Sequence, residues 1–202
     1  MAVLDWMQTD HGPVLQDTVV RLRLPRQADY PAWSDLRRKS EAYLRPWEPK
    51  WPEDDLTRAA FRRRLSVYAR EVEAERAWPF FIFDDAGLVG AITLSNVRRG
   101  VADAGTLGYW IGQPHAGRGL ATRAVRLMAG YAFDTLGLHR LEAACVPENT
   151  ASRRVLEKSA FRLEGVARAY LNINGAWRDH LLFARLEDDV AAGSNTRGLH
   201  RT

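Results

Sequence analysis

The chain has 202 residues, of which 46% are hydrophobic and 27% charged, and its formal net charge is +4. This length and composition predict a globular protein of one domain with a full hydrophobic core. No apolar run approaches the roughly 18 residues that cross a membrane, and Asp5 and Asp10 interrupt the region where a signal peptide would be apolar. We therefore expect no membrane segment and no secretion signal.

The cysteine content and the charge narrow the class of protein further. Cys145 is the only cysteine, so no intrachain disulfide framework is expected, and this suits a reducing compartment such as the cytoplasm. The positive charge favours anionic partners, but the sequence has neither zinc-ligand spacing nor a pair of RNA-binding aromatic strands. The densest basic run, Arg62-Arg63-Arg64, is explained more simply by a solvated helix surface than by an RNA-docking patch. We expect no metal site and no direct nucleic-acid recognition.

The two ends of the chain differ from its middle. Residues 1–18 have little periodicity, and we expect them to form a mobile arm before the folded domain, 19–188. Within that domain, apolar residues alternate with arginines over 20–24, a pattern typical of a half-exposed strand. Residues 189–202 are small and polar, and they are expected to form a flexible tail.

Helical patterns follow the first strand. Asp29 is a candidate N-cap for a first helix. The segment 41–52 is aromatic and interrupted by prolines, which favours a loop or a broken helix. Asp54 or Asp55 is then expected to cap a long amphipathic helix that ends near Glu75.

Most of the remaining apolar runs are typical of strands. Five of them lie at 78–83, 88–97, 104–111, 161–171 and 177–186. An acidic turn ending in Gly87 joins the first two, and Asn174-Gly175 joins the last two, so each pair is expected to form a hairpin. With a strand at 141–146 and helices over 120–136 and 150–159, the order β-αα-βββ-α-β-α-ββ predicts one mixed α/β sheet.

A glycine-rich turn lies between the 104–111 strand and the helix that follows it. Gly117 and Gly119 flank Arg118, and glycine allows both a close backbone approach and conformations closed to other residues. The first turn of a helix offers unpaired N–H groups to a phosphate. A nucleotide P-loop would need a Gly-Lys pair, and a dinucleotide turn would need a glycine or alanine at Thr122. A tight turn without a ligand remains the alternative.

A second motif follows the 141–146 strand, with the pattern Asn-x-x-Ser-x-x-x-Leu-Glu-Lys-x-x-Phe from Asn149 to Phe161. The strand, the Gly-x-Gly-x-Ala turn, the helix, the second strand and this motif together resemble the acetyl-CoA-binding core of the GNAT N-acetyltransferases. Further segments resemble the RimJ-type ribosomal-protein-alanine N-acetyltransferases, and these are Tyr43–Pro49, Ser95–Gly100, Leu107–Gln113 and Gly175–His180. The resemblance extends from about Val19 to Leu186.

This resemblance implies a fold and a cofactor site. The fold would be a single-domain, mixed, mostly antiparallel twisted sheet, with helices on both faces and a splayed strand pair that holds CoA. Backbone N–H groups of the turn would bind the CoA pyrophosphate, and its residues are Gly117, Arg118, Gly119, Leu120, Ala121 and Thr122. The splayed strand would pair with the pantetheine arm, through Leu107, Tyr109, Trp110 and Ile111. One N–H near Tyr109–Ile111 would also polarise the thioester carbonyl.

The Asn/Ser motif has two interpretations. Asn149 and Ser152 lie one helical turn apart, so helix capping by Asn149 is the plain one. The resemblance instead implies that Asn149 bonds to the pantetheine and that Ser152 donates a proton to the leaving thiolate. Tyr170 is an alternative proton donor.

The general base is less clear. Many relatives have a glutamate where Thr106 stands, and the remaining acidic candidates are Glu48, Asp103 and Asp179, of which Glu48 lies in the segment expected to line the acceptor cleft. An α-amino group has a pKa of roughly 8, so much of it is already neutral near neutral pH, whereas lysine at about 10.4 is almost fully charged. The absence of an obvious base therefore mildly favours an N-terminal amine as acceptor.

The leading hypothesis is an acetyl-CoA-dependent N-acetyltransferase that acts on the N-terminal amine of a protein, ribosomal in the branch it resembles. The attack would be direct, by the neutral amine, with acetyl-CoA as cosubstrate and no metal. The expected protein is a monomer or homodimer. One alternative acceptor is a lysine, a polyamine or another small amine. A second alternative is a CoA-binding sensor or interaction module without catalysis.

Overall fold

The computed structural model describes residues 12–189. The strands are β1 (Val14–Gln16), β2 (Arg21–Arg23), β3 (Trp78–Asp84), β4 (Gly87–Arg98), β5 (Ala104–Ile111), β6 (Arg140–Cys145), β7 (Arg162–Ile173) and β8 (Ala176–Leu186). The α-helices are α1 (Tyr30–Lys39), α2 (Glu41–Leu44), α3 (Arg58–Glu73), α4 (Leu120–Gly130) and α5 (Thr150–Lys158). Shorter helical turns are η1 (Gln27–Asp29), η2 (Arg45–Trp47), η3 (Gln113–His115) and the π-helical η4 (Tyr131–Thr135).

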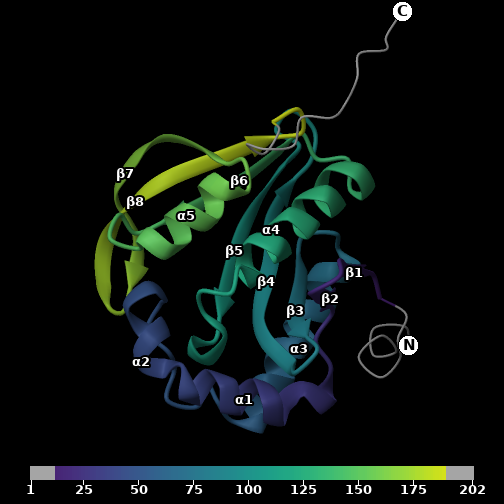
Figure 1. Ribbon diagram of the computed structural model, residues 1–202, viewed down its shortest axis with the longest axis vertical. Coiled ribbons are helices and arrows are strands. Elements are labelled where there is room, and N and C mark those ends of the chain that lie inside the picture. The colour runs from purple at the N-terminus through teal and green to yellow at the C-terminus, as the bar shows by residue number, and fades with distance from the viewer. Residues whose placement is uncertain (1–11, 190–202) are drawn as a thin grey trace, which may run out of the picture.

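All eight strands form one sheet in the order β1-β2-β3-β4-β5-β6-β8-β7 (Figure 1). Every neighbouring pair is antiparallel except β5 and β6, which are parallel because α4 crosses between them. The β5–β6 pairing ends at Leu107 and Ala143, although β5 stays paired with β4 as far as Ile111. The two central strands therefore separate beyond this point, as expected for the splayed strand pair, and the sheet is mixed and mostly antiparallel as predicted.

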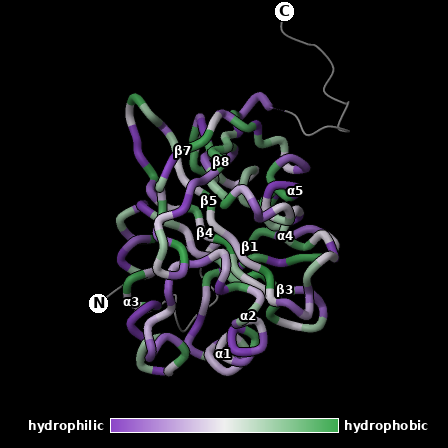
Figure 2. Tube along the Cα trace, turned by 90° about the vertical axis from the view of Figure 1, so that its left-hand side faces the viewer, coloured by the Kyte–Doolittle hydropathy of each residue, from purple (hydrophilic) through white to green (hydrophobic). Residues whose placement is uncertain are grey.

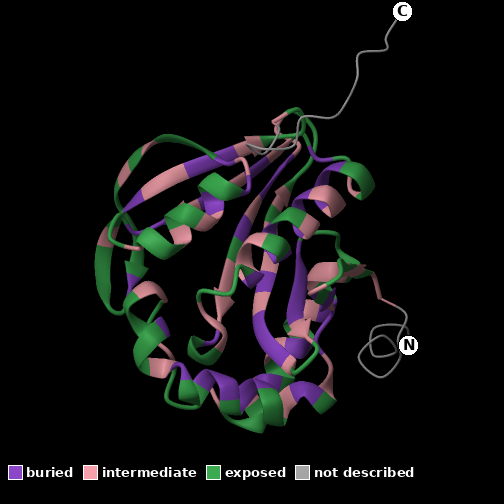
Figure 3. Cartoon of the chain, viewed as in Figure 1, coloured by how far each residue is buried: buried purple, intermediate pink, exposed green. Residues whose placement is uncertain are grey.

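Helices cover both faces of the sheet. On one face, α4 and α5 pack on a large apolar core that includes Leu22, Phe80, Leu107 and Met128. On the other, α1 and α3 enclose a smaller aromatic cluster around Phe61. Figure 3 shows that burial is concentrated in the middle strands, whereas β7 is largely exposed.

The β7–β8 hairpin reaches back to the N-terminal helices. In Figure 1 it curves down toward α2, and in the perpendicular view of Figure 2 it again lies above α1 and α2. The backbone N–H of Asn174, in the hairpin turn, donates to the carbonyl oxygen of Glu48 at 2.9 Å. The hairpin and the η2 segment thus meet across the open end of the sheet.

Most predicted elements are present, with differences in how the helices begin. The broken helix expected over 41–52 is α2 followed by η2. The N-cap of α3 is Thr57, not Asp54 or Asp55: the Thr57 hydroxyl accepts a hydrogen bond from Ala60 N, while the two carboxylates pair with Arg63 and Arg64 further along the helix.

Asp29 also differs from expectation. It precedes α1, but its carboxylate accepts from Arg26 N and from the guanidinium of Arg23, and gives α1 no side-chain cap. The helix expected over 120–136 changes to a π turn after Gly130, and Gly137 follows its end with a φ of +64°, the left-handed conformation typical of a glycine after a helix.

The two ends of the chain are described only in part. Within the predicted arm, β1 pairs with β2 through Leu15 and Leu22, a strand that the sequence did not predict because three residues carry too little periodicity. The rest of the arm before Gly12 and the predicted tail from Val190 onward lie outside the described residues. Among the helices of residues 12–189, none is long and apolar enough to cross a membrane.

Replacing Thr57 with alanine should destabilise the protein through α3. Because the Thr57 hydroxyl satisfies an otherwise unpaired N–H of the first turn, T57A is expected to lower the free energy of unfolding by about 1 kcal/mol in urea titrations. D54A is the matched control: it removes only a solvent-exposed ion pair with Arg63, worth about 0.5 kcal/mol or less. A larger loss in D54A than in T57A would contradict this assignment of the cap.

Candidate active site

The glycine-rich turn has the geometry of an anion-binding helix start. Gly117 and Gly119 have φ of +76° and +77°, and Gly119 is the N-cap residue of α4. No atom lies within 4 Å of a Cβ built on either glycine, so the space in front of the turn is open. The side chain of Arg118 turns back to Asp84 in the β3–β4 turn, with Nη1 2.9 Å from Oδ2. The turn therefore presents backbone N–H groups to a ligand, while the Arg118 guanidinium is directed away toward Asp84.

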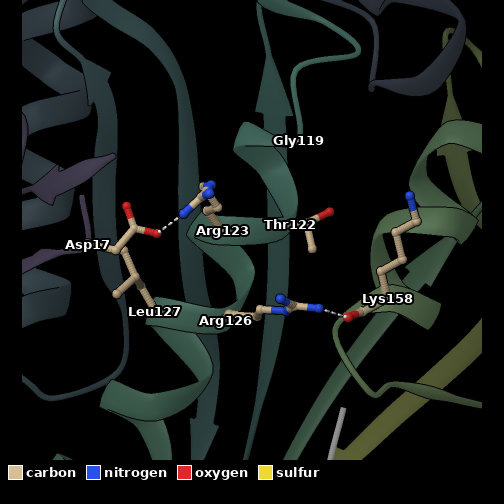
Figure 4. A pocket seen from close by; sticks show the side chains of 7 residues that line it. All are labelled: Asp17, Gly119, Thr122, Arg123, Arg126, Leu127 and Lys158. Carbon is tan, nitrogen blue, oxygen red and sulfur yellow. Dashed lines mark hydrogen bonds and ion pairs between the residues drawn. The ribbon is translucent and has the colours of Figure 1, made fainter. Parts of the chain in front are cut away.

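A cavity of about 480 Å³ opens beside the turn, along one side of α4 (Figure 4). It is lined by Asp17, Gly119, Thr122, Arg123, Arg126, Leu127 and Lys158. Arg123 is held by Asp17 at 2.9 Å, and Arg126 donates to the carbonyl oxygen of Lys158 at 2.6 Å. Three cationic side chains, Arg123 and Arg126 of α4 and Lys158 at the end of α5, therefore line the cavity beside the helix start, which suits a phosphate-containing ligand.

The separation of β5 from β6 creates the second part of the site. Within residues 12–189, no strand pairs with the β6-facing edge of β5 from Gly108 to Ile111, whose other edge is paired with β4. Such an edge can accept an extended, amide-containing ligand as an added strand. The predicted cofactor strand residues Tyr109, Trp110 and Ile111 lie on this edge, and Leu107 marks where the opening begins.

Tyr109 and Ser152 meet at this opening. The Tyr109 hydroxyl lies 2.9 Å from Ser152 Oγ, and either oxygen can donate. Burial raises the pKa of Tyr109 well above its usual value, an effect that the hydrogen bond to Ser152 only partly offsets. The phenol therefore stays protonated at physiological pH, and the pair forms a two-hydroxyl chain that can deliver a proton.

Asn149 occupies the position that helix capping requires. Its Oδ1 accepts a hydrogen bond from Ser152 N at 3.0 Å, which makes it the N-cap of α5. The capping interpretation is thus confirmed. Contact with a cofactor stays a prediction, to which the amide nitrogen of Asn149 remains suited.

Glu48 takes part in a buried charge network. Its two carboxylate oxygens each accept a hydrogen bond from Arg37 at 2.8 Å, and Oε2 also accepts from Trp51 Nε1 at 2.6 Å. The Arg37 guanidinium stacks on Trp51 and lies 5.0 Å from the ring centroid of Trp110. Arg37 and Trp51 thus hold the Glu48 carboxylate in a fixed position beside the end of β5.

The remaining candidates lie apart from Ser152. Tyr170 is half exposed on β7 and contacts the ring of His180 edge-on, at 5.8 Å between centroids. Asp179 accepts from Ala169 N, as a brace of the final hairpin would. Asp103, at the opposite end of β5, accepts the backbone N–H groups of His139 and Arg140 through its carbonyl. Its proposed role as base gains no support from this position.

Sequence reasoning missed several side chains of the site. The Tyr109 hydroxyl was not assigned a role, because its partner is 43 residues away and meets it only through the sheet register. Arg123 and Arg126, three residues apart on one helix, gave a signal that could have been used. Arg37 gave no sequence signal of a role in the site, because its partners Glu48 and Trp110 come from two separate segments of the chain. Within residues 12–189, no group of three or more metal-ligating side chains is present.

Comparison with known proteins identifies the family. The sequence model of one family, described as "Acetyltransferase (GNAT) domain", matches residues 20–162. This chain belongs to the GNAT acetyltransferase family. The predicted GNAT-like fold and N-acetyltransferase class are thereby confirmed.

Relatives and solved structures agree in detail. The ribosomal protein uS5-alanine N-acetyltransferase of Escherichia coli is 34% identical over 185 residues, which cover 90% of this chain and 95% of that protein. The probable N-acetyltransferase YjcK of Bacillus subtilis is 40% identical over 139 residues, covering 68% and 77%. The structure of Mycobacterium smegmatis RimJ in complex with CoA-disulfide superposes with a TM-score of 0.83 at 36% identity, covering 89% of this chain and 88% of that one.

A bulky side chain at Gly119 should block the phosphate turn. G119W is expected to abolish CoA binding in calorimetry, since the ring would fill the open space in front of the N–H groups of α4. The matched control is G100W, because Gly100 has the same kind of backbone, with a φ of +80°, and equally open surroundings in the β4–β5 turn. Retained affinity in G119W, or equal loss in both variants, would refute the placement.

Proposed function

We propose that this protein transfers the acetyl group of acetyl-CoA to the N-terminal α-amine of a protein, and that this protein is ribosomal. The observation that carries the proposal is the combination of the phosphate turn at the start of α4, the free edge of β5 and the Tyr109–Ser152 pair. The acceptor class rests on the Escherichia coli relative, whose similarity covers 90% of this chain. The proposed setting is the cytoplasm, with the enzyme a monomer or homodimer.

The donor would lie along α4 and β5. The backbone N–H groups from Gly117 to Thr122 would bind the pyrophosphate, and the cationic cavity beside them would take the remaining phosphate of CoA. The pantetheine arm, which contains amides, would pair with the free edge of β5 as an added strand. This arrangement would direct the thioester into the opening, where a strand N–H near Tyr109–Ile111 can polarise its carbonyl.

The chemistry that follows is a direct transfer. The neutral amine attacks the thioester carbonyl, the new C–N bond forms, and the C–S bond breaks as the CoA thiolate leaves. Ser152 and Tyr109 lie on the α4–α5 face of the opening and supply the proton that the thiolate takes up. An N-terminal amine suits this site better than lysine, because its pKa of roughly 8 leaves a larger neutral fraction at physiological pH.

The acceptor is tested with a panel of amines in an assay for free CoA thiol. The panel holds peptides that start with Ala, Ser or Met of ribosomal proteins, the same peptides N-terminally blocked but carrying lysine, and small amines. Turnover confined to free N-termini is the expected result. Turnover of blocked peptides or small amines would move the acceptor to a side-chain or small-molecule amine, and tight CoA binding without any turnover would favour a sensor.

Removing the two hydroxyls should affect turnover and not donor binding. S152A and Y109F are each expected to lower kcat by about 10- to 100-fold, within the range for a lost proton donor, with little change in the affinity for CoA. The double variant should be no worse than about the poorer single one, since both hydroxyls belong to one proton path. Multiplicative losses in the double variant would show that the two hydroxyls act separately. Thermal melting checks that each variant is as stable as the wild-type protein.

A further inference from the structure

The transfer leaves one proton unaccounted for, the one that the acceptor amine loses. Thr106 offers no carboxylate, and both oxygens of Glu48 are bound by Arg37. A group with a free lone pair near the opening would resolve this. His180 is such a group: it is 2% exposed, it lies on β8, and neither donor binding nor thiolate protonation uses it.

The strand register places His180 level with the opening. Ala143 pairs with both Leu107 on β5 and Phe183 on β8, so these three residues mark one level of the sheet. Trp110 lies three residues beyond Leu107, and His180 lies three residues beyond Phe183 in the same direction, since β8 runs antiparallel to β6. Trp110 and His180 therefore stand at equal height on the two sides of the opening.

Both residues also lie on the same face of the sheet. Leu107 and Tyr109 of β5, and Leu181 and Phe183 of β8, pack against the core beneath α4 and α5. Side chains alternate along a strand, so Trp110 and His180 project to the opposite face. An amine that approaches from this face would meet the thioester from the side away from Ser152.

The hydrogen bond of the His180 ring determines which nitrogen is free. Nδ1 lies 3.0 Å from the carbonyl oxygen of Arg178, and a carbonyl oxygen can only accept, so Nδ1 carries the hydrogen. In the neutral imidazole this leaves the lone pair on Nε2. The edge-on contact with Tyr170 holds the ring from β7.

We propose that Nε2 of His180 is the general base that accepts the proton of the acceptor amine. The proposal rests on the proposed function and adds a catalytic residue to it. As the C–N bond forms and the C–S bond breaks, the amine proton moves to Nε2, and a different proton reaches the thiolate from the Tyr109–Ser152 pair. After the amide leaves, the imidazolium releases its proton to solvent and the Tyr109–Ser152 pair takes one up from solvent, so amine and thioester give amide and thiol and the enzyme is restored.

The charged side chains next to His180 in the sequence, and Glu48 by the hairpin turn, have partners of their own. The guanidinium of Arg178 lies 3.2 Å from Glu148, Asp179 accepts from Ala169 N, and Glu48 is bound to Arg37.

The test compares H180N with wild type in steady-state acetylation of a free N-terminal peptide. The asparagine amide can keep the hydrogen bond to the Arg178 carbonyl but has no basic lone pair. We expect kcat to fall by about 100-fold or more at pH 7, with CoA affinity and melting temperature close to wild type. The remaining activity should rise about tenfold per pH unit, following the free amine up to its pKa of roughly 8. H139N, which changes an exposed histidine at the other end of the sheet, is the matched control.

A loss in H180N of less than about threefold would overturn the proposal. So would a loss that is accompanied by equal loss of CoA affinity. If H180N does not fold, long-range ¹H–¹⁵N NMR of the wild-type protein decides: a hydrogen on Nδ1 supports the proposal, and a hydrogen on Nε2 overturns it. Failure of the proposed function is distinct, because it would appear in the wild-type protein as turnover of blocked peptides or small amines. The ratio of the H180N kcat to the wild-type kcat is then measured with that amine as the acceptor.

Discussion

The constraint on which the site depends is the end of the β5–β6 pairing at Leu107 and Ala143. Each strand continues with its other neighbour, so the opening is held apart from both sides and cannot collapse without breaking the ladders to β4 and β8. A strand edge with unpaired N–H and C=O groups is a ready template for pairing with another extended chain. The fold thus keeps an edge that an amide-containing ligand can satisfy, and α4 begins just beyond it with its N–H groups directed outward.

The acceptor side is organised by a different kind of interaction. Arg37 is 6% exposed and joins α1 to Glu48, Trp51 and Trp110 through ion pairing and stacking. A buried ion pair contributes little net stability, because the cost of removing both charges from water offsets their attraction. Its directional, bidentate geometry instead fixes where the 45–55 segment lies, next to the end of β5. Since Glu48 also anchors the β7–β8 turn through its carbonyl, one residue connects both walls of the opening.

The sequence predicted features that depend on neighbouring residues, and it failed for features that depend on contacts between residues distant in the sequence. Periodicity and turn chemistry are local, and they predicted the strands from β2 to β8 and the glycine-rich turn before α4 correctly. The cap of α3 was predicted wrongly because Asp54, Asp55 and Thr57 are all good capping residues, and only tertiary pairing of the two carboxylates with arginines decides among them. Contacts such as Tyr109 with Ser152 depend on strand register, which no local pattern contains.

The apolar surroundings of Cys145 bear on whether transfer is direct or passes through an acetyl-cysteine intermediate. It faces the core at the end of β6, and burial raises the pKa of its thiol, an effect that a hydrogen bond to Ser152 opposes without cancelling. A nucleophilic cysteine needs the reverse, a thiolate favoured by exposure or by a neighbouring cation. An acetyl-cysteine intermediate is therefore disfavoured at this position. The apolar surroundings that keep the thiol neutral also keep Tyr109 protonated, which is consistent with the direct transfer that we propose, in which Tyr109 and Ser152 supply the proton for the leaving thiolate.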